Sequence, residues 1–136
     1  MCIRDRYLVR HQSSLSLNLG PLSVNHAALH CHCHQKAFAT AGDVETVLGW
    51  IPDLQVDPIA SSCCGMAGDF GQWAQTYGVS MAMGELSLLP AVRDLPAESA
   101  IVAGGTSCRQ QISHGSGRTA VHYVQLLQSA LAAGSK

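Results

Sequence analysis

Apolar positions along the chain alternate between short runs typical of strands and longer repeats typical of helices. Strands are predicted over residues 23–30, 54–59 and 99–103, and the last of these is rich in apolar residues, as a buried parallel strand is. Apolar residues spaced three and four apart predict helices over residues 40–51, 70–77, 80–95, 107–114 and 118–133. This alternation predicts an α/β fold with a small, mostly parallel sheet flanked by helices.

Three residues are expected to end or interrupt these helices. Pro52 follows the helix predicted over 40–51 and should end it. Gly78 separates the stretches 70–77 and 80–95. Pro90 lies inside the second stretch and lacks a backbone N–H, so we expect it to kink or split that helix.

The N-terminal 22 residues do not follow the strand–helix alternation. Residues 1–6 fit no element and resemble translated adapter sequence, and residues 7–22 are rich in Ser and Leu without a clear period. We therefore expect residues 1–22 to be an artefact or the remnant of a linker from a truncated N-terminal side. Residues 23–136 are expected to form one cysteine-rich domain, and Cys2 is then not a biological residue.

Charge and hydropathy narrow the range of partners and compartments. Eight Lys and Arg against nine Asp and Glu give a formal net charge of −1, so no basic surplus is present to bind nucleic acid. No apolar run approaches the length of a membrane span, and the N-terminal region lacks the apolar core of a signal peptide. The chain is therefore predicted to be cytoplasmic, where cysteines are kept reduced.

Cysteine is the most informative residue type in the chain, which has six Cys and seven His in 136 residues. Cys31 and Cys33 follow the first predicted strand, the adjacent Cys63 and Cys64 follow the second, and Cys108 follows the third. The carboxyl ends of parallel strands lie along one edge of a sheet, so these loops should converge on one site.

The residues alone leave several kinds of site open. Thiolate-rich sites without two closely spaced CxxC pairs favour an iron–sulfur cluster, because neighbouring cysteines ligate different irons more easily than one metal ion. A zinc site, a catalytic dithiol and inert buried thiols are the alternatives.

The run from His30 to His34 alternates His and Cys. If this run is extended, Cys31 and Cys33 share one face and the three histidines share the other. Each histidine is then either a ligand or hydrogen-bond donor to the site, or a polar residue at a strand end. His114 and His122 are expected to be surface or loop residues.

Three segments with a motif cysteine carry a family resemblance: His32-Cys33-His34-Gln35-Lys36-Ala37, Cys63-Cys64-Gly65-Met66-Ala67-Gly68 and Ser107-Cys108-Arg109-Gln110-Gln111-Ile112. Together they resemble the cysteine-rich "CCG" domain. That domain occurs in heterodisulfide reductase subunits, glycolate oxidase iron–sulfur subunits and FAD-linked D-2-hydroxyacid dehydrogenases. The chain is most similar to the C-terminal part of large fused FAD- and Fe–S-binding oxidoreductases of the D-2-hydroxyglutarate or D-lactate dehydrogenase type.

The resemblance implies an iron–sulfur electron-transfer domain with no catalytic residue of its own. Its implied cluster ligands are Cys33, Cys63, Cys64 and Cys108. Further candidates, either as ligands or as residues that contact the ligands, are His32, His34, Lys36, Gly65, Arg109 and Gln111. Gln111 stands where the general motif has a second cysteine of a CxxC pair, which leaves the cluster type, or zinc, open.

The same resemblance implies cofactors and partners beyond this chain. FAD would be bound by an upstream flavin domain or subunit, and a ferredoxin-like domain or subunit would also lie upstream of this chain. Electrons would pass on to an acceptor. A fragment of this kind is not expected to be active alone. The alternative functions are a zinc-stabilised docking module and a heterodisulfide-type thiol-redox site that uses Cys63 and Cys64.

Overall fold

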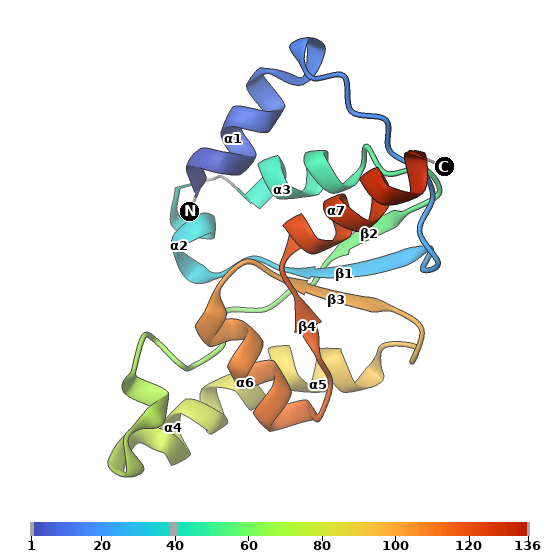
Figure 1. The fold of residues 1–136 in the computed structure, drawn as a ribbon. Coiled ribbons are helices and arrows are strands. Elements are labelled where there is room, and N and C mark those ends of the chain that lie inside the picture. Colours follow the sequence, from blue (N-terminus) through green and yellow to red (C-terminus); the bar gives the residue numbers. More distant parts are fainter. Residues whose placement is uncertain (1, 39–40, 136) are drawn as a thin grey trace.

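Short strands alternate with helices in the computed structural model, which describes residues 2–38 and 41–135 (Figure 1). The strands are β1 (His26–His30), β2 (Gln55–Pro58), β3 (Ala100–Ala103) and β4 (Ala120–Val121). The α-helices are α1 (Cys2–Arg10), α2 (Cys33–Ala37), α3 (Ala41–Leu48), α4 (Ala74–Glu85), α5 (Leu88–Asp94), α6 (Thr106–Ser116) and α7 (Tyr123–Gly134). Two 3-10 helices are η1 (Gln12–Ser14) and η2 (Phe70–Gln72).

The four strands form one sheet in the order β2-β1-β3-β4, and each neighbouring pair is parallel. The two central strands, β1 and β3, are buried along most of their length, which explains their apolar sequences. The edge strand β2 is largely exposed and ends in Pro58, a residue that sheets tolerate at an edge. The predicted α/β fold with a parallel sheet is confirmed.

Helices cover both faces of the sheet and enclose a separate apolar cluster on each side (Figure 1). On one face α1, α3 and α7 pack over a cluster that includes Leu29, Val47 and Leu127. On the other face α5 and α6 pack over a cluster that includes Leu88 and Ile112 together with two of the cysteines. The sheet therefore separates a purely structural core from one that borders the candidate site.

The helices between β2 and β3 differ from the prediction. Helix α4 runs through Gly78 without a break, and the chain instead turns at Leu86 and Ser87. Pro90 lies in the first turn of α5, where helix N–H groups have no partner within the helix, so a proline causes no kink there. Residues 70–72 form η2, so the helix predicted over 70–77 begins only at Ala74.

The C-terminal segment contains a strand that the sequence did not predict. Instead of one helix over residues 118–133, Ala120 and Val121 pair with β3 and α7 begins at Tyr123. His122 caps that helix: its Nδ1 accepts a hydrogen bond from the Val124 amide at 3.2 Å, and its own amide donates to Gln125 at 2.9 Å. A two-residue strand is too short to show any period.

The N-terminal residues also differ from the prediction, because Cys2–Arg10 forms α1 where no element was expected. This helix packs beside α3, and Leu8 and Val9 contact the apolar cluster on that face, as do Leu19 and Leu22. The boundary between residues 22 and 23 stays a prediction.

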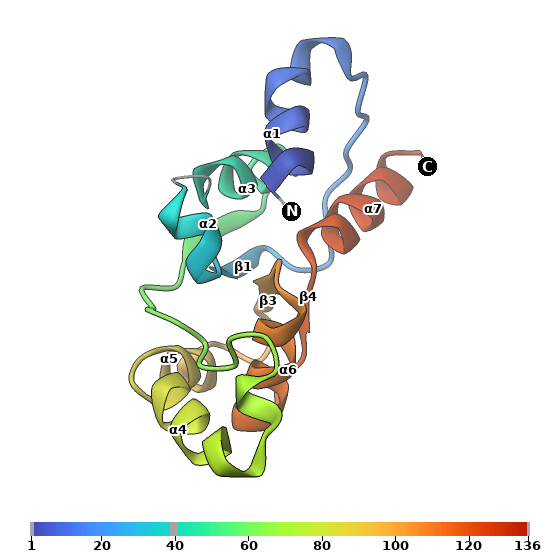
Figure 2. The same cartoon turned by 90° about the vertical axis from the view of Figure 1, so that its left-hand side faces the viewer.

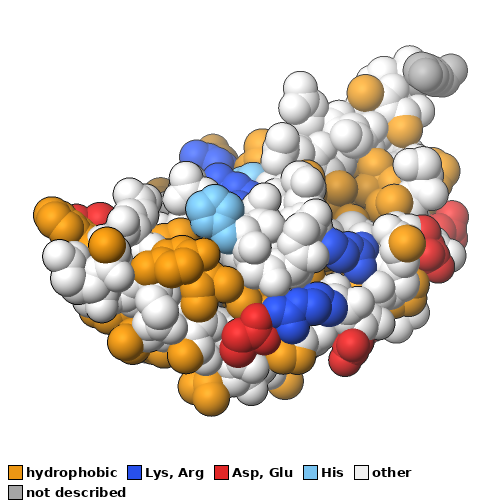
Figure 3. Space-filling view, turned by 90° about the horizontal axis from the view of Figure 1, so that it is seen from below, with side chains coloured by type: hydrophobic (Ala, Val, Ile, Leu, Met, Phe, Trp, Pro, Cys, Tyr) orange, Lys and Arg blue, Asp and Glu red, His pale blue; other side chains and the backbone are white. Residues whose placement is uncertain are grey.

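The surface over α4, α5 and α6 carries apolar and charged side chains side by side (Figure 3). Lys and Arg do not gather there into a continuous basic area, and Arg93 forms an ion pair with Glu85. Within residues 2–38 and 41–135, no helix is both long enough and apolar enough to cross a membrane.

Candidate functional site

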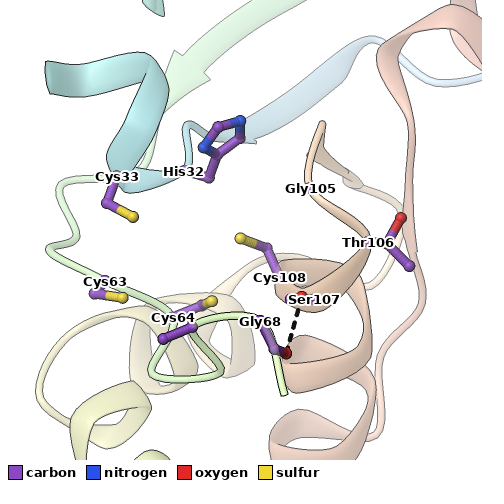
Figure 4. A pocket seen from close by; sticks show the side chains of 10 residues that line it. His32, Cys33, Cys63, Cys64, Gly68, Gly105, Thr106, Ser107 and Cys108 are labelled. Carbon is purple, nitrogen blue, oxygen red and sulfur yellow. Dashed lines mark hydrogen bonds between the residues drawn. The ribbon is translucent and has the colours of Figure 1, made fainter. Parts of the chain in front are cut away.

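The carboxyl ends of β1, β2 and β3 lie at one edge of the sheet, and the segments that follow them meet there (Figure 2). Cys33 begins α2 after β1, Cys63 and Cys64 lie in the loop after β2, and Cys108 lies in the first turn of α6 after β3. These four side chains line one pocket of about 350 Å³ (Figure 4). The remaining lining residues are His32, Ala67, Gly68, Gly105, Thr106 and Ser107.

The four cysteines divide into an exposed pair and a buried pair. Cys33 is exposed and Cys63 is half-buried, whereas Cys64 and Cys108 are 5% and 4% exposed. Thiol–thiol contacts follow this division, since Cys33 hydrogen-bonds with Cys63 and Cys64 with Cys108. All four are free thiols.

The two buried thiols have pKa values shifted in opposite directions. The hydrogen bond from the Cys108 thiol lowers the pKa of Cys64, and the neighbouring His30 and the Met66 amide lower it further against the effect of burial. The same hydrogen bond, with burial, raises the pKa of Cys108. Burial also raises the pKa of Cys63, partly offset by a hydrogen bond from the Gly65 amide. A thiolate at Cys64 is thus the most readily formed in the buried pair.

Cys31 does not belong to the pocket. Strand β1 ends at His30 and α2 begins at Cys33, so the alternating faces predicted for this run end within it. Cys31 is 5% exposed and packs in the apolar cluster beside Leu29 and Val44, where burial raises the pKa of its thiol. The run is therefore not extended over its whole length, which was the condition for Cys31 and Cys33 to share one face, and the two thiols lie in different surroundings.

The loop after Cys64 is shaped by glycines. Gly65 has a φ of +91° and its backbone amide donates to the Cys63 sulfur at 3.4 Å. A Cβ at Gly65 would come within 2.1 Å of the Ser80 carbonyl oxygen, so only glycine fits there. Close backbone packing and an amide aimed at sulfur therefore coincide at this one residue.

Lys36 and Arg109 fasten the cysteine-bearing segments. The Lys36 ammonium, one turn after Cys33, donates to the carbonyls of Ser61 and, at 3.2 Å, Ser62, which directly precede Cys63. Arg109 donates to the carbonyls of Ala103 and Gly104 at 2.9 and 3.0 Å, at the end of β3. Neither cation lines the pocket, and both hold backbone in place around it.

Gln111 is fully buried and does not line the pocket. Its Nε2 donates to the backbone oxygen and to the hydroxyl of Ser80, each at 3.0 Å, and so ties α6 to α4. Ser80 contacts both this amide and the Gly65 loop, and it is not among the site residues expected from the sequence. Gln111 therefore holds Ser80 in place, and Ser80 in turn packs against the loop that carries Cys63 and Cys64.

The three histidines of the run occupy different environments. His32 lines the pocket, and burial followed by the neighbouring His34 and His30 lowers the pKa of its imidazole. His34 is exposed, with its ring 4.7 Å from that of Phe38. His30 is 1% exposed. The Nε2 atoms of His30 and His32 are buried without a hydrogen-bond partner among the described residues.

The donor set around the pocket consists of sulfur and imidazole nitrogen. As the side chains stand, the described part of the chain contains no group of three or more His, Cys, Asp or Glu that surrounds one metal ion. Four thiols distributed around a pocket, with two imidazole nitrogens lacking partners nearby, are donors of the kind that hold an iron–sulfur cluster. Thiolate and imidazole are also the ligands that zinc uses in proteins.

Comparison with known proteins finds relatives among dehydrogenases. The chain is 29% identical over 119 residues to one subunit of the anaerobic glycerol-3-phosphate dehydrogenase of Escherichia coli K12, a match that covers 86% of this chain and 29% of that relative. It is 36% identical over 73 residues to the D-2-hydroxyglutarate dehydrogenase of the same organism, covering 54% of this chain and 7% of that protein. No family model and no solved structure matches the chain.

These relatives support a role for the chain in an oxidoreductase. The chain spans less than a third of the length of the first relative, so the comparison concerns one part of such a protein. That relative is by name one of the subunits of a dehydrogenase, which agrees with a chain that works beside other subunits or domains.

Proposed function

We propose that this chain is an iron–sulfur electron-transfer domain, a C-terminal part of a flavin-dependent oxidoreductase that oxidises a D-2-hydroxyacid. The observation that carries the proposal is the meeting of Cys33, Cys63, Cys64 and Cys108 at one pocket on the carboxyl edge of the sheet. The similarity to two dehydrogenases supports the general role, and the resemblance to the CCG domain supports the cluster.

The chain's own residues would hold the cluster from three directions. The four cysteines supply the thiolates, and the Gly65 amide already donates to one of their sulfurs. Lys36 holds the segments of Cys33 and Cys63 together, and Ser107 donates to the Gly68 carbonyl across the pocket at 3.5 Å (Figure 4). An iron–sulfur cluster bound here would accept and pass on single electrons.

Substrate oxidation belongs to parts of the protein outside this chain. We infer an upstream flavin domain that binds FAD and oxidises the hydroxyacid, a ferredoxin-like segment that relays electrons, and an acceptor that takes them from this domain. The described lining of the pocket holds no paired acid and base for hydroxyacid oxidation, since its polar side chains are thiols, hydroxyls and one imidazole.

The test is the metal content and spectra of the chain after anaerobic purification and reconstitution with iron and sulfide. We expect bound iron and acid-labile sulfide, visible absorption and an EPR signal on reduction. Single Cys→Ser substitutions at the four pocket positions should each lower the iron content several-fold, because each removes a thiolate ligand. Cys31→Ala is the matched control and should keep the iron, since Cys31 lies in the opposite core cluster.

A colourless protein with one zinc ion and no sulfide would contradict this function and favour the zinc-stabilised docking module. A thiol-redox site was expected to use Cys63 and Cys64. The specific observation in its favour concerns a different pair, because Cys64 contacts Cys108. In that case oxidised glutathione would take two electrons and two protons from the two thiols and leave a disulfide. An unchanged number of thiols on the protein, counted after glutathione has been removed, excludes it.

A further inference from the structure

His30 is buried at the end of β1, and only part of its hydrogen-bonding capacity is used. It is 1% exposed and pairs in register with Ala103 of β3, which places it at the base of the candidate site. A buried imidazole normally has partners for both nitrogens, because an unpaired polar atom costs free energy. We therefore expect the Nε2 atom of His30 to have a hydrogen-bond partner in the functional state of the site.

The partner of Nδ1 is the hydroxyl of Ser61, at 2.8 Å. Ser61 precedes Cys63 by two residues, so this contact joins β1 to the cysteine-bearing loop. We assign the hydroxyl as donor and Nδ1 as acceptor, which leaves the hydrogen of a neutral imidazole on Nε2.

The nitrogen that carries this hydrogen is the one without a partner among the described residues. The functional side chain beside it is Cys64, with which His30 interacts. A purely structural role for His30 would be fulfilled by the Ser61 contact and would leave no reason for a second polar atom buried against a thiol.

We propose that His30 is a positioning residue that donates its Nε2–H to the Cys64 sulfur and raises the reduction potential of the cluster. A hydrogen bond to a ligand sulfur stabilises the additional negative charge of the reduced state, so it makes reduction easier. The effect on potential rests on the proposed function, whereas the hydrogen bond itself does not require a cluster.

The hydrogen bond can be tested in the cluster-free chain by NMR of the imidazole nitrogens. We expect His30 to be the Nε2–H tautomer, with an Nε2 resonance that moves when Cys64→Ala removes the acceptor. The resonances of His34, which is exposed at the other end of the run, should stay unchanged in that variant. An Nδ1–H tautomer, or an Nε2 resonance that ignores Cys64→Ala, would overturn the proposal.

The effect on the cluster is measured as the midpoint potential of the reconstituted chain. His30→Leu should shift the potential to more negative values, and His30→Gln, which keeps a donor of similar reach, should restore part of the shift. His114→Leu, at an exposed histidine of α6 that does not line the pocket, is the matched control and should leave the potential unchanged. Equal potentials for the wild type, His30→Leu and His30→Gln would overturn the tuning role.

The two experiments separate failure of this proposal from failure of the proposed function. A wild-type chain that binds no iron refutes the cluster, and the tautomer measurement then decides the His30–Cys64 hydrogen bond alone. A chain that binds iron but shows no shift with His30→Gln or His30→Leu keeps its function and loses this role for His30. Where His30→Leu does not fold, His30→Gln decides the question, because an altered donor geometry should still move the potential.

Discussion

Two glycines in the loop after Cys64 have left-handed backbone conformations for different reasons. Gly65 (φ +91°) packs against the Ser80 carbonyl, whereas Gly68 (φ +71°) has open space where a Cβ would be. A side chain at Gly68 would be unfavourable only because of its left-handed backbone conformation. A side chain at Gly65 would also clash with the Ser80 carbonyl oxygen. The pair separates conformational strain from close packing at the site.

We predict that Gly68→Ala lowers the free energy of unfolding by about 1–2 kcal/mol, the cost of a left-handed conformation for an L-residue. Gly65→Ala should cost clearly more and should also lower iron binding, because the loop must move away from Ser80 and take Cys63 and Cys64 with it. Chemical denaturation and iron analysis of both variants check this. Equal losses in the two variants would contradict the packing argument.

At the level of single residues, the sequence identified the pocket cysteines and several of their neighbours, but not Ser80. Four cysteines after three strands are recognisable because parallel strands end at one edge, whatever the details of the loops. The separation of Cys31 from Cys33 depends on the residue at which β1 ends, and hydrophobic patterns do not fix boundaries so closely. Ser80 is distant in sequence from Gln111, and its contacts with Gln111 and the Gly65 loop arise only when α4 packs against α6.

Among the elements, α7 depends on a cap that titrates. His122 accepts the Val124 amide through Nδ1, which requires an unprotonated nitrogen. Burial, followed by the charges of Arg109 and Arg4, lowers the pKa of His122 in the folded chain. The unfolded chain therefore takes up the proton first as the pH falls, so this contribution to stability is present above the ordinary histidine pKa and is lost below it.

We predict that His122→Asn keeps the cap and weakens the loss of stability between about pH 7 and pH 5, because asparagine caps without titrating. His122→Ala should destabilise the chain at neutral pH by about 1 kcal/mol, the usual cost of losing an N-cap. Denaturation curves of the three proteins at both pH values provide the comparison. The cap assignment fails if asparagine and alanine behave alike at neutral pH.

The helices also show which local signals are overridden by packing. Gly78 and Pro90 are residues that commonly interrupt helices, yet α4 continues through the glycine and the proline sits at a helix start. A single glycine costs only about 1 kcal/mol within a helix, which tertiary contacts offset. The strand β4 escaped prediction because its two residues gain their partners only from β3.

At the scale of the whole molecule, the candidate site lies where the parallel sheet ends and the segments after β1, β2 and β3 begin. One core cluster lies on the face of the sheet away from the site, and the other includes Cys64 and Cys108. The fold class and the edge at which the site lies were predictable, since both follow from the order of strands and helices. The division of the cysteines between core and surface required the packed structure.

We predict that loss of the cluster lowers the thermal stability of the whole domain, because a group bound only by the folded state ties the segments after β1, β2 and β3 together. For a chain of this size, saturating binding corresponds to a shift in melting temperature of about 5–15 °C. Melting curves before and after chelation of the reconstituted chain measure it. Cys108→Ser, which lacks a ligand, is the control that chelation should not affect, and an equal shift in both proteins would contradict the assignment.

The unequal burial of the four cysteines gives the site a vulnerable side. Cys64 and Cys108 are enclosed by the core, while the Cys33 thiol is open to solvent. Oxygen or a competing thiol from the solvent reaches Cys33 before the buried cysteines. We therefore expect oxidation of the site in air to begin at Cys33. The buried thiols of Cys64 and Cys108 would stay reduced for longer, so the site could be reconstituted once Cys33 is reduced again.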